Sequence, residues 1–161
     1  FSQEKVDAPR LALMYNAADC TVNISDAEGF GLATLESLAC ETPIIVNMTG
    51  GLQEQVTDGE NWFGIGLEPT SKAIIGSQAI PYIYEDRLSE EAVVNAFVEI
   101  YNKTKEEREA LGAAGREHVQ KNYNFENFCK QWDVIMTDIH ERFGSWPTQS
   151  GRKTWTIKEV A

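Results

Sequence analysis

The chain has 161 residues, enough for one domain with a modest core, and 25 Asp and Glu against 14 Lys and Arg give it a net charge of −11. No Lys or Arg occurs between residues 11 and 71. Because affinity for nucleic acid or for an anionic membrane surface rests on Lys and Arg, this charge argues against both kinds of partner.

The sequence also lacks the usual signals of membrane insertion and of metal or disulfide chemistry. It has no apolar run of about 18 residues and no secretory signal, so we expect a cytoplasmic protein without a transmembrane segment. Cys20, Cys40 and Cys129 are too few and too scattered for a disulfide framework or a zinc site, and we expect reduced thiols.

Predicted helices and strands alternate through the first 67 residues. Apolar side chains at helical spacing predict helices over residues 8–18 and 31–40. Short apolar runs predict strands at 20–24, 43–47 and 62–67, and the continuous β-branched run of the second suggests a strand covered on both faces. An α/β fold with a parallel sheet is therefore expected.

A glycine-rich turn containing Gly29 and Gly31 separates the first strand from the helix at 31–40. Such a turn at the carboxyl end of a parallel strand lets a ligand approach the backbone, and the helix that follows offers unpaired N–H groups to an anion. Ser25 or Asp26 is expected to cap this helix. Its predicted buried stripe consists of Leu32, Leu35, Leu38 and Ala39.

Two carboxylates bracket this segment, Glu28 before the turn and Glu36 within the helix. Eight helical steps at ~1.5 Å each separate them by about 12 Å, too far to share a proton or a metal ion. They suit the two hydroxyl-bearing ends of a long ligand with a central anion, and a nucleotide sugar has that shape. A second glycine turn, Gly50 and Gly51, opens a short helix to about Val56 and lies beside the first if the strands pair in parallel.

The remainder of the chain is mostly helical. We interpret residues 69–88 as an inserted loop or hairpin in which the alternating Ile80, Tyr82 and Tyr84 form an edge strand. Helices are expected over 89–103, 105–122 and 125–143, and the last has an aromatic face. The tail at 144–161, which contains Trp146 and Trp155, is either disordered or docked on a partner.

The ordered series of motifs resembles one known family. Glu28-Gly-Phe-Gly-Leu32 with Glu36, then Thr42-Pro43 before a strand, Gly50-Gly51 and Asp58-Gly59, is similar to the donor half of a retaining GT-B glycosyltransferase of family 4, in the glycosyl transferases group 1. The resemblance implies a Rossmann-like parallel sheet flanked by helices, the C-terminal half of a GT-B fold, incomplete at its N-terminus. It places a partial donor-binding domain at residues 1–143 and a separate tail at 144–161.

The resemblance also implies what the residues do. The substrate would be a nucleoside diphosphate sugar whose sugar passes to an unknown acceptor with retention of anomeric configuration. Glu28 would be the catalytic residue that contacts the transferred sugar, and Glu36 would accept hydrogen bonds from the ribose. The other donor-binding residues would be Gly29, Phe30, Gly31, Leu32, Gly50 and Gly51.

The family pattern implies further partners and some absences. No cofactor and no metal are expected, and the partners would be the nucleotide sugar and the protein's own N-terminal acceptor domain. The resemblance places the cations for the diphosphate in a segment before Phe1, since we expect no cation of this chain near the glycine turns. A fragment of this kind would be inactive without its N-terminal domain.

Several alternatives remain open. Glu36 on an ordinary helix surface and Glu28 as a first-turn acid would need no ligand, and the alternative role of Gly50 and Gly51 is only to shape a turn. The chain could also be a non-catalytic nucleotide-sugar binding module, or a related GT-B enzyme such as a nucleotide-sugar epimerase. The aromatic face of helix 125–143 is either ordinary core or a surface that crosses back onto the N-terminal domain.

Overall fold

The structure, a computed structural model, describes residues 5–145, and the predicted tail therefore lies almost entirely outside the described residues. The chain divides into two compact units, one ending at Asn122 and the other beginning at Tyr123. The domain boundaries drawn from the sequence stay a prediction. The elements of the first unit are α1 (Ala8–Asn16), β1 (Thr21–Asn23), α2 (Leu32–Ala39), β2 (Ile44–Asn47), α3 (Leu52–Val56), β3 (Ile65–Leu67), β4 (Ser71–Ser77), β5 (Ile80–Arg87), α4 (Glu90–Asn102) and α5 (Lys105–Asn122).

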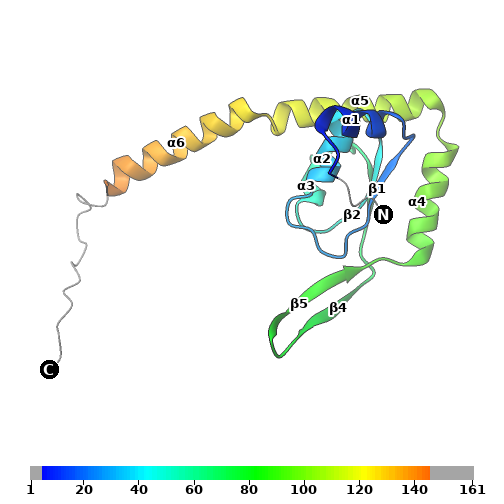
Figure 1. Cartoon of the computed structure of the whole chain (residues 1–161), viewed down its shortest axis with the longest axis horizontal. Coiled ribbons are helices and arrows are strands. Elements are labelled where there is room, and N and C mark those ends of the chain that lie inside the picture. Colours follow the sequence, from blue (N-terminus) through cyan, green and yellow to red (C-terminus); the bar gives the residue numbers. More distant parts are fainter. Residues whose placement is uncertain (1–4, 146–161) are drawn as a thin grey trace. The chain divides into compact units, whose positions relative to one another are not determined.

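A three-stranded parallel sheet in the order β1-β2-β3 forms the centre of the first unit (Figure 1). All four residues of β2 are buried, as its continuous apolar sequence predicts. Because side chains alternate along a strand, Ile44 and Val46 face one side of the sheet and Ile45 faces the other. The predicted α/β fold with a sheet covered on both faces is confirmed.

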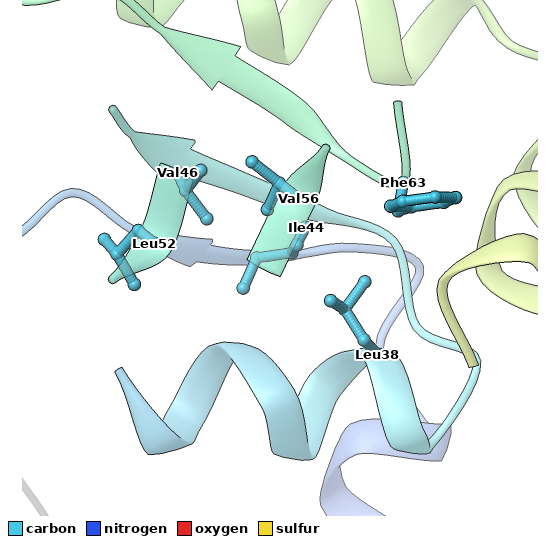
Figure 2. Close-up of a cluster of buried hydrophobic side chains, with 6 residues drawn as sticks. All are labelled: Leu38, Ile44, Val46, Leu52, Val56 and Phe63. Atoms are coloured by element: carbon cyan, nitrogen blue, oxygen red, sulfur yellow. The ribbon is translucent and has the colours of Figure 1, made fainter. Parts of the chain in front are cut away.

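The larger core lies where α2, α3 and Phe63 meet one face of β2. Figure 2 shows Leu38 pointing from α2 toward Ile44, with Val46 and Leu52 close together at the other end of the cluster. Each such buried aliphatic side chain stabilises the fold by about 1.5 to 3 kcal/mol. The opposite face of the sheet carries a second cluster that consists of Ile45, Leu67, Ala96 and Ile100, the last two from α4.

Two glycines allow α5 to lie directly against α2. A Cβ built on Gly112 would be 1.9 Å from the carbonyl oxygen of Glu41, and one built on Gly115 would be 2.6 Å from Cδ2 of Leu38. The overlap at Gly112 is with backbone, so the close packing of α5 on the end of α2 depends on this glycine, whereas a side chain at Gly115 would displace the end of the Leu38 side chain.

The predicted buried stripe of α2 is confirmed at Leu38 but wrong at Leu32 and Ala39, and Leu35 is half-buried. Leu32 is 66% exposed, and the helix instead buries Thr34 and Ser37 together with Leu38. The hydroxyl groups of Ser37 and Thr21 lie 2.5 Å apart, and Asn23 donates a hydrogen bond to Thr34. Small side chains whose polar groups are paired with β1 therefore let the helix approach the sheet closely.

Residues 69–88 form an antiparallel hairpin of β4 and β5, which pair only with each other among the described strands. The predicted strand through Ile80, Tyr82 and Tyr84 is confirmed as β5, and Figure 1 shows the hairpin (green) extending away from the three-stranded sheet. Whether the hairpin is an insertion relative to the family stays a prediction.

The second unit contains α6 (Phe125–Phe143), whose bounds agree with the predicted helix. The side chain of Asn124 caps it by accepting a hydrogen bond from the Asn127 N–H at 2.8 Å. Phe125, Phe128 and Trp132 follow one another along the helix, with neighbouring ring centroids 6.2 Å apart in each pair. No residue of α6 is buried, so in the described part of this unit the aromatic face forms no core.

Candidate functional site

The two glycine turns lie side by side at the carboxyl edge of the sheet. β1 and β2 are parallel neighbours, so the loop after β1 and the turn after β2 emerge at the same edge. The N–H of Gly51 donates to the carbonyl oxygen of Gly29 at 3.0 Å, which joins the two turns directly. The sequence predicted that these turns would be adjacent if the strands paired in parallel, and this prediction is confirmed.

Glycine is required where the turns touch. Gly50 has a φ of 50°, and a Cβ there would lie 1.7 Å from the carbonyl oxygen of Glu28. A Cβ on Gly51 would lie 2.7 Å from the carbonyl oxygen of Phe30. Both clashes are with backbone atoms, which cannot rotate away. Gly50 and Gly51 therefore determine how closely the two turns approach each other, as well as the shape of the turn that they form.

The N-terminus of α2 carries no side-chain cap. Its N-cap residue is Gly31, which adopts the left-handed conformation with a φ of 85°. The prediction that Ser25 or Asp26 would cap this helix is wrong: the Ser25 hydroxyl bonds Asn23 at 2.9 Å, and Asp26 pairs with Arg87 at 2.9 Å. An uncapped helix N-terminus leaves backbone N–H groups available to an anion.

Glu28 and Glu36 differ in their surroundings. Glu28 is half-buried in the loop before the turn, and Glu36 is exposed on the second turn of α2. The Tyr15 hydroxyl donates a hydrogen bond to the Glu36 carboxylate at 3.0 Å. Burial, followed by this hydrogen bond, raises the pKa of Tyr15 to about 12, so the phenol stays protonated and keeps donating.

Four of the other predicted donor-binding residues, 29–32, lie between these two carboxylates in the sequence. Gly29 and Phe30 are exposed, Phe30 by 53%, and Gly31 is buried beneath the turn. Leu32, the first residue of α2, is also exposed. The structure thus brings Glu28, Gly29 and Phe30, at the start of this segment, against Gly50 and Gly51.

Gln55 supports this arrangement, and the sequence did not single it out. It is fully buried on α3, and its side-chain amide donates to the carbonyl oxygen of Phe30. Its Oε1 lies 3.2 Å from the position that a Cβ on Gly31 would take, and within the described residues it has no hydrogen-bond partner. Gln55 lies three residues after Leu52 and one before Val56. This spacing is the sequence signal that could have shown Gln55 to be buried.

A cation of this chain also lies near the turns, contrary to expectation. Lys72, on β4 of the hairpin, lines a cavity of about 550 Å³ together with Gly50. The prediction that no local cation would be found is therefore wrong, because the hairpin returns to the glycine turn across more than 20 residues of sequence.

Within residues 5–145, no helix combines the length and the apolar character that a bilayer span needs. No group of three or more His, Cys, Asp or Glu side chains in this part of the chain is arranged to hold a metal ion.

The chain is similar to glycosyltransferases in sequence. The family model of the glycosyl transferases group 1 matches residues 3–118. A D-inositol 3-phosphate glycosyltransferase of Thermomonospora curvata is 46% identical over 68 residues, which cover 42% of this chain and 16% of that protein. A second protein of that description, from Catenulispora acidiphila, is 33% identical over 119 residues, 66% of this chain and 28% of the relative. The chain thus spans less than a third of these relatives.

Solved structures give the same result for the fold. Sucrose-phosphate synthase from Thermosynechococcus elongatus superimposes with a TM-score of 0.64 at 30% identity, covering 86% of this chain and 29% of that one. The C-terminal domain of a glycosyl transferase group 1 protein from Francisella tularensis superimposes with a TM-score of 0.55 at 23% identity, covering 78% of this chain and 53% of that one. The chain belongs to the glycosyl transferases group 1 and has the fold of the C-terminal domain of a GT-B glycosyltransferase.

Proposed function

We propose that this chain is the donor-binding part of a retaining glycosyltransferase that transfers a sugar from a nucleoside diphosphate sugar to an acceptor. The observation that carries the proposal is the joined pair of glycine turns, with Glu28 at one end of the adjoining segment and Glu36 at the other. Ligands of open α/β sheets bind at this edge.

Each part of the segment suits one part of such a donor. In this proposal Glu28 binds hydroxyl groups of the transferred sugar, and Glu36 binds those of the ribose. Each carboxylate-to-hydroxyl bond contributes about 1.5 to 3 kcal/mol. The diphosphate lies against the backbone of residues 29–32 and the uncapped N-terminus of α2, where the helix dipole adds ~0.3 to 1 kcal/mol.

The transfer itself needs positioning more than a protein nucleophile. In a front-face reaction the acceptor oxygen forms its bond to the anomeric carbon on the side that the phosphate leaves, and the leaving phosphate takes the acceptor's proton. Glu28 and the backbone N–H groups would hold the sugar and the departing charge. We propose that this chemistry uses no cofactor or metal of this segment and that a separate N-terminal domain binds the acceptor.

A binding experiment on the full-length protein tests the proposal. Thermal shift is measured with UDP-, GDP- and ADP-sugars for the wild type, for Glu36→Ala and for a matched control, Glu60→Ala, whose exposed carboxylate lies in the turn after Thr57. We expect one donor series to stabilise the wild type and Glu60→Ala but to have little effect on Glu36→Ala. Equal stabilisation of all three proteins would remove Glu36 from the site.

A further inference from the structure

The β4–β5 hairpin is attached to the loop that carries the candidate site. The N–H of Asp86 donates to the carbonyl oxygen of Asp26 at 2.8 Å, and the Arg87 guanidinium pairs with the Asp26 carboxylate at 2.9 Å. Glu85 pairs with the other guanidinium nitrogen at 3.0 Å. These contacts fix the base of the hairpin beside the segment that leads to Glu28.

An open cavity lies between the hairpin and the carboxyl ends of two strands. The cavity, of about 550 Å³, lies at the carboxyl ends of β2 and β3, and such a volume falls within the range of ordinary ligand pockets, roughly 300 to 1,000 Å³. Its lining includes Thr49 and Gly50 after β2, Glu68 after β3, and Lys72, Tyr84 and Asp86 from the hairpin.

The lining combines hydrogen-bond donors and acceptors of several kinds. The Lys72 ammonium lies 3.5 Å from the Asp86 carboxylate. Neither the Glu68 carboxylate nor the Tyr84 hydroxyl makes a hydrogen bond or ion pair within the described residues, and each is therefore available to a ligand. Two carboxylates against one ammonium disfavour an anion, and the predominantly polar side chains disfavour an apolar ligand.

Carbohydrate hydroxyl groups fit this lining because each of them both donates and accepts. A carboxylate accepts from one hydroxyl, an ammonium donates to the next, and a tyrosine hydroxyl does either. Gly50 also lies against the backbone carbonyl of Glu28, so one turn borders the cavity and contacts the backbone of the residue proposed to bind sugar.

We propose that the hairpin cavity is a subsite for sugar hydroxyl groups, in which Lys72 and Tyr84 determine which sugar is accepted. The inference rests on the proposed function and extends it to the hairpin. The hydroxyl groups belong either to the transferred sugar of the donor or to a sugar acceptor, and the two sources are separated by experiment.

The test compares two tyrosines of the same strand. Tyr84 lines the cavity and Tyr82 does not, although the two are 69% and 67% exposed, so Tyr82→Phe is a matched control for Tyr84→Phe. Lys72→Met is the second variant, because it removes the ammonium and keeps a long side chain. All three substitutions lie on exposed hairpin positions and leave the buried cores intact.

Binding is measured on the full-length protein by calorimetry with UDP-, GDP- and ADP-glucose, with the matching mannose donors, and with the free diphosphates UDP, GDP and ADP. If the cavity holds the transferred sugar, Tyr84→Phe weakens binding of the nucleotide sugar about 3- to 10-fold and Lys72→Met by ~10-fold or more, with the free diphosphate unchanged. If it holds an acceptor sugar, these affinities stay constant. Saturation-transfer signals of free glucose or mannose, recorded with the diphosphate present, then fall in both variants.

Responses of Tyr84→Phe and Lys72→Met that match those of Tyr82→Phe in both arms would overturn the inference. Glu36→Ala separates this result from a failure of the proposed function. Loss of free diphosphate binding in Glu36→Ala with no effect of the hairpin variants rejects the cavity alone. The reverse pattern rejects the role of Glu36 in binding the nucleotide and supports the cavity.

Discussion

Replacement of Gly50 by alanine tests the contact between the two glycine turns. At a φ of 50° an alanine costs about 1 to 2 kcal/mol relative to glycine, because its Cβ crowds the following carbonyl oxygen. In addition, the new Cβ would lie 1.7 Å from the carbonyl oxygen of Glu28 and 2.8 Å from its carbonyl carbon. Since backbone must move to relieve this overlap, the overpacking adds about 1 to 3 kcal/mol. We expect Gly50→Ala to lower the free energy of unfolding by roughly 2 to 5 kcal/mol.

Equilibrium urea unfolding measures this loss, and Gly59→Ala is its control. Gly59 has a φ of 94°, also positive, but a Cβ there would meet nothing within 4 Å. Gly59→Ala should therefore lose only the backbone cost of about 1 to 2 kcal/mol. The difference between the two variants measures the steric contact between the turns. Equal losses for Gly50→Ala and Gly59→Ala would refute the reasoning that the second turn is pressed against Glu28.

Three further predictions concern single side chains. Burial raises the pKa of Cys20 to about 11, so iodoacetamide should modify the exposed Cys129 much faster than Cys20 at pH 8. Mass spectrometry after timed quenching measures the two rates, and similar rates would contradict the burial of Cys20. Because the pKa of Tyr15 is raised from 10.0 to about 12, its stabilising contribution is complete below pH 10 and is lost as the pH rises through about 12. Tyr15→Phe should abolish this part of the pH dependence of unfolding, and an unchanged profile would contradict the raised pKa. Gly112→Ala should raise the helix propensity of α5 yet destabilise the fold by ~1 to 3 kcal/mol in urea unfolding, because its Cβ would lie 1.9 Å from the carbonyl oxygen of Glu41. A gain in stability would show that α5 can shift away from α2.

The identity and order of the elements were determined by the sequence. The continuous β-branched run before Asn47 predicted a strand buried on both faces, and the spacing of apolar residues from Phe125 to Phe143 predicted a helix. Side-chain periodicity is a local property of the backbone, which is why these predictions agree with the structure. The adjacency of the two glycine turns also followed, once the strands were taken to be parallel.

Contacts between distant segments were decided only by the tertiary structure. The buried face of α2 depends on the side chains of β1 that it contacts. Ser37 is buried because its hydroxyl group pairs with that of Thr21, whereas periodicity alone predicted that Leu32 would be buried. Likewise the bond from Gln55 to the glycine turn and the return of Lys72 to Gly50 join residues 25 and 22 positions apart. Nothing in local spacing encodes such pairs, because they arise from the packing of whole elements on the sheet.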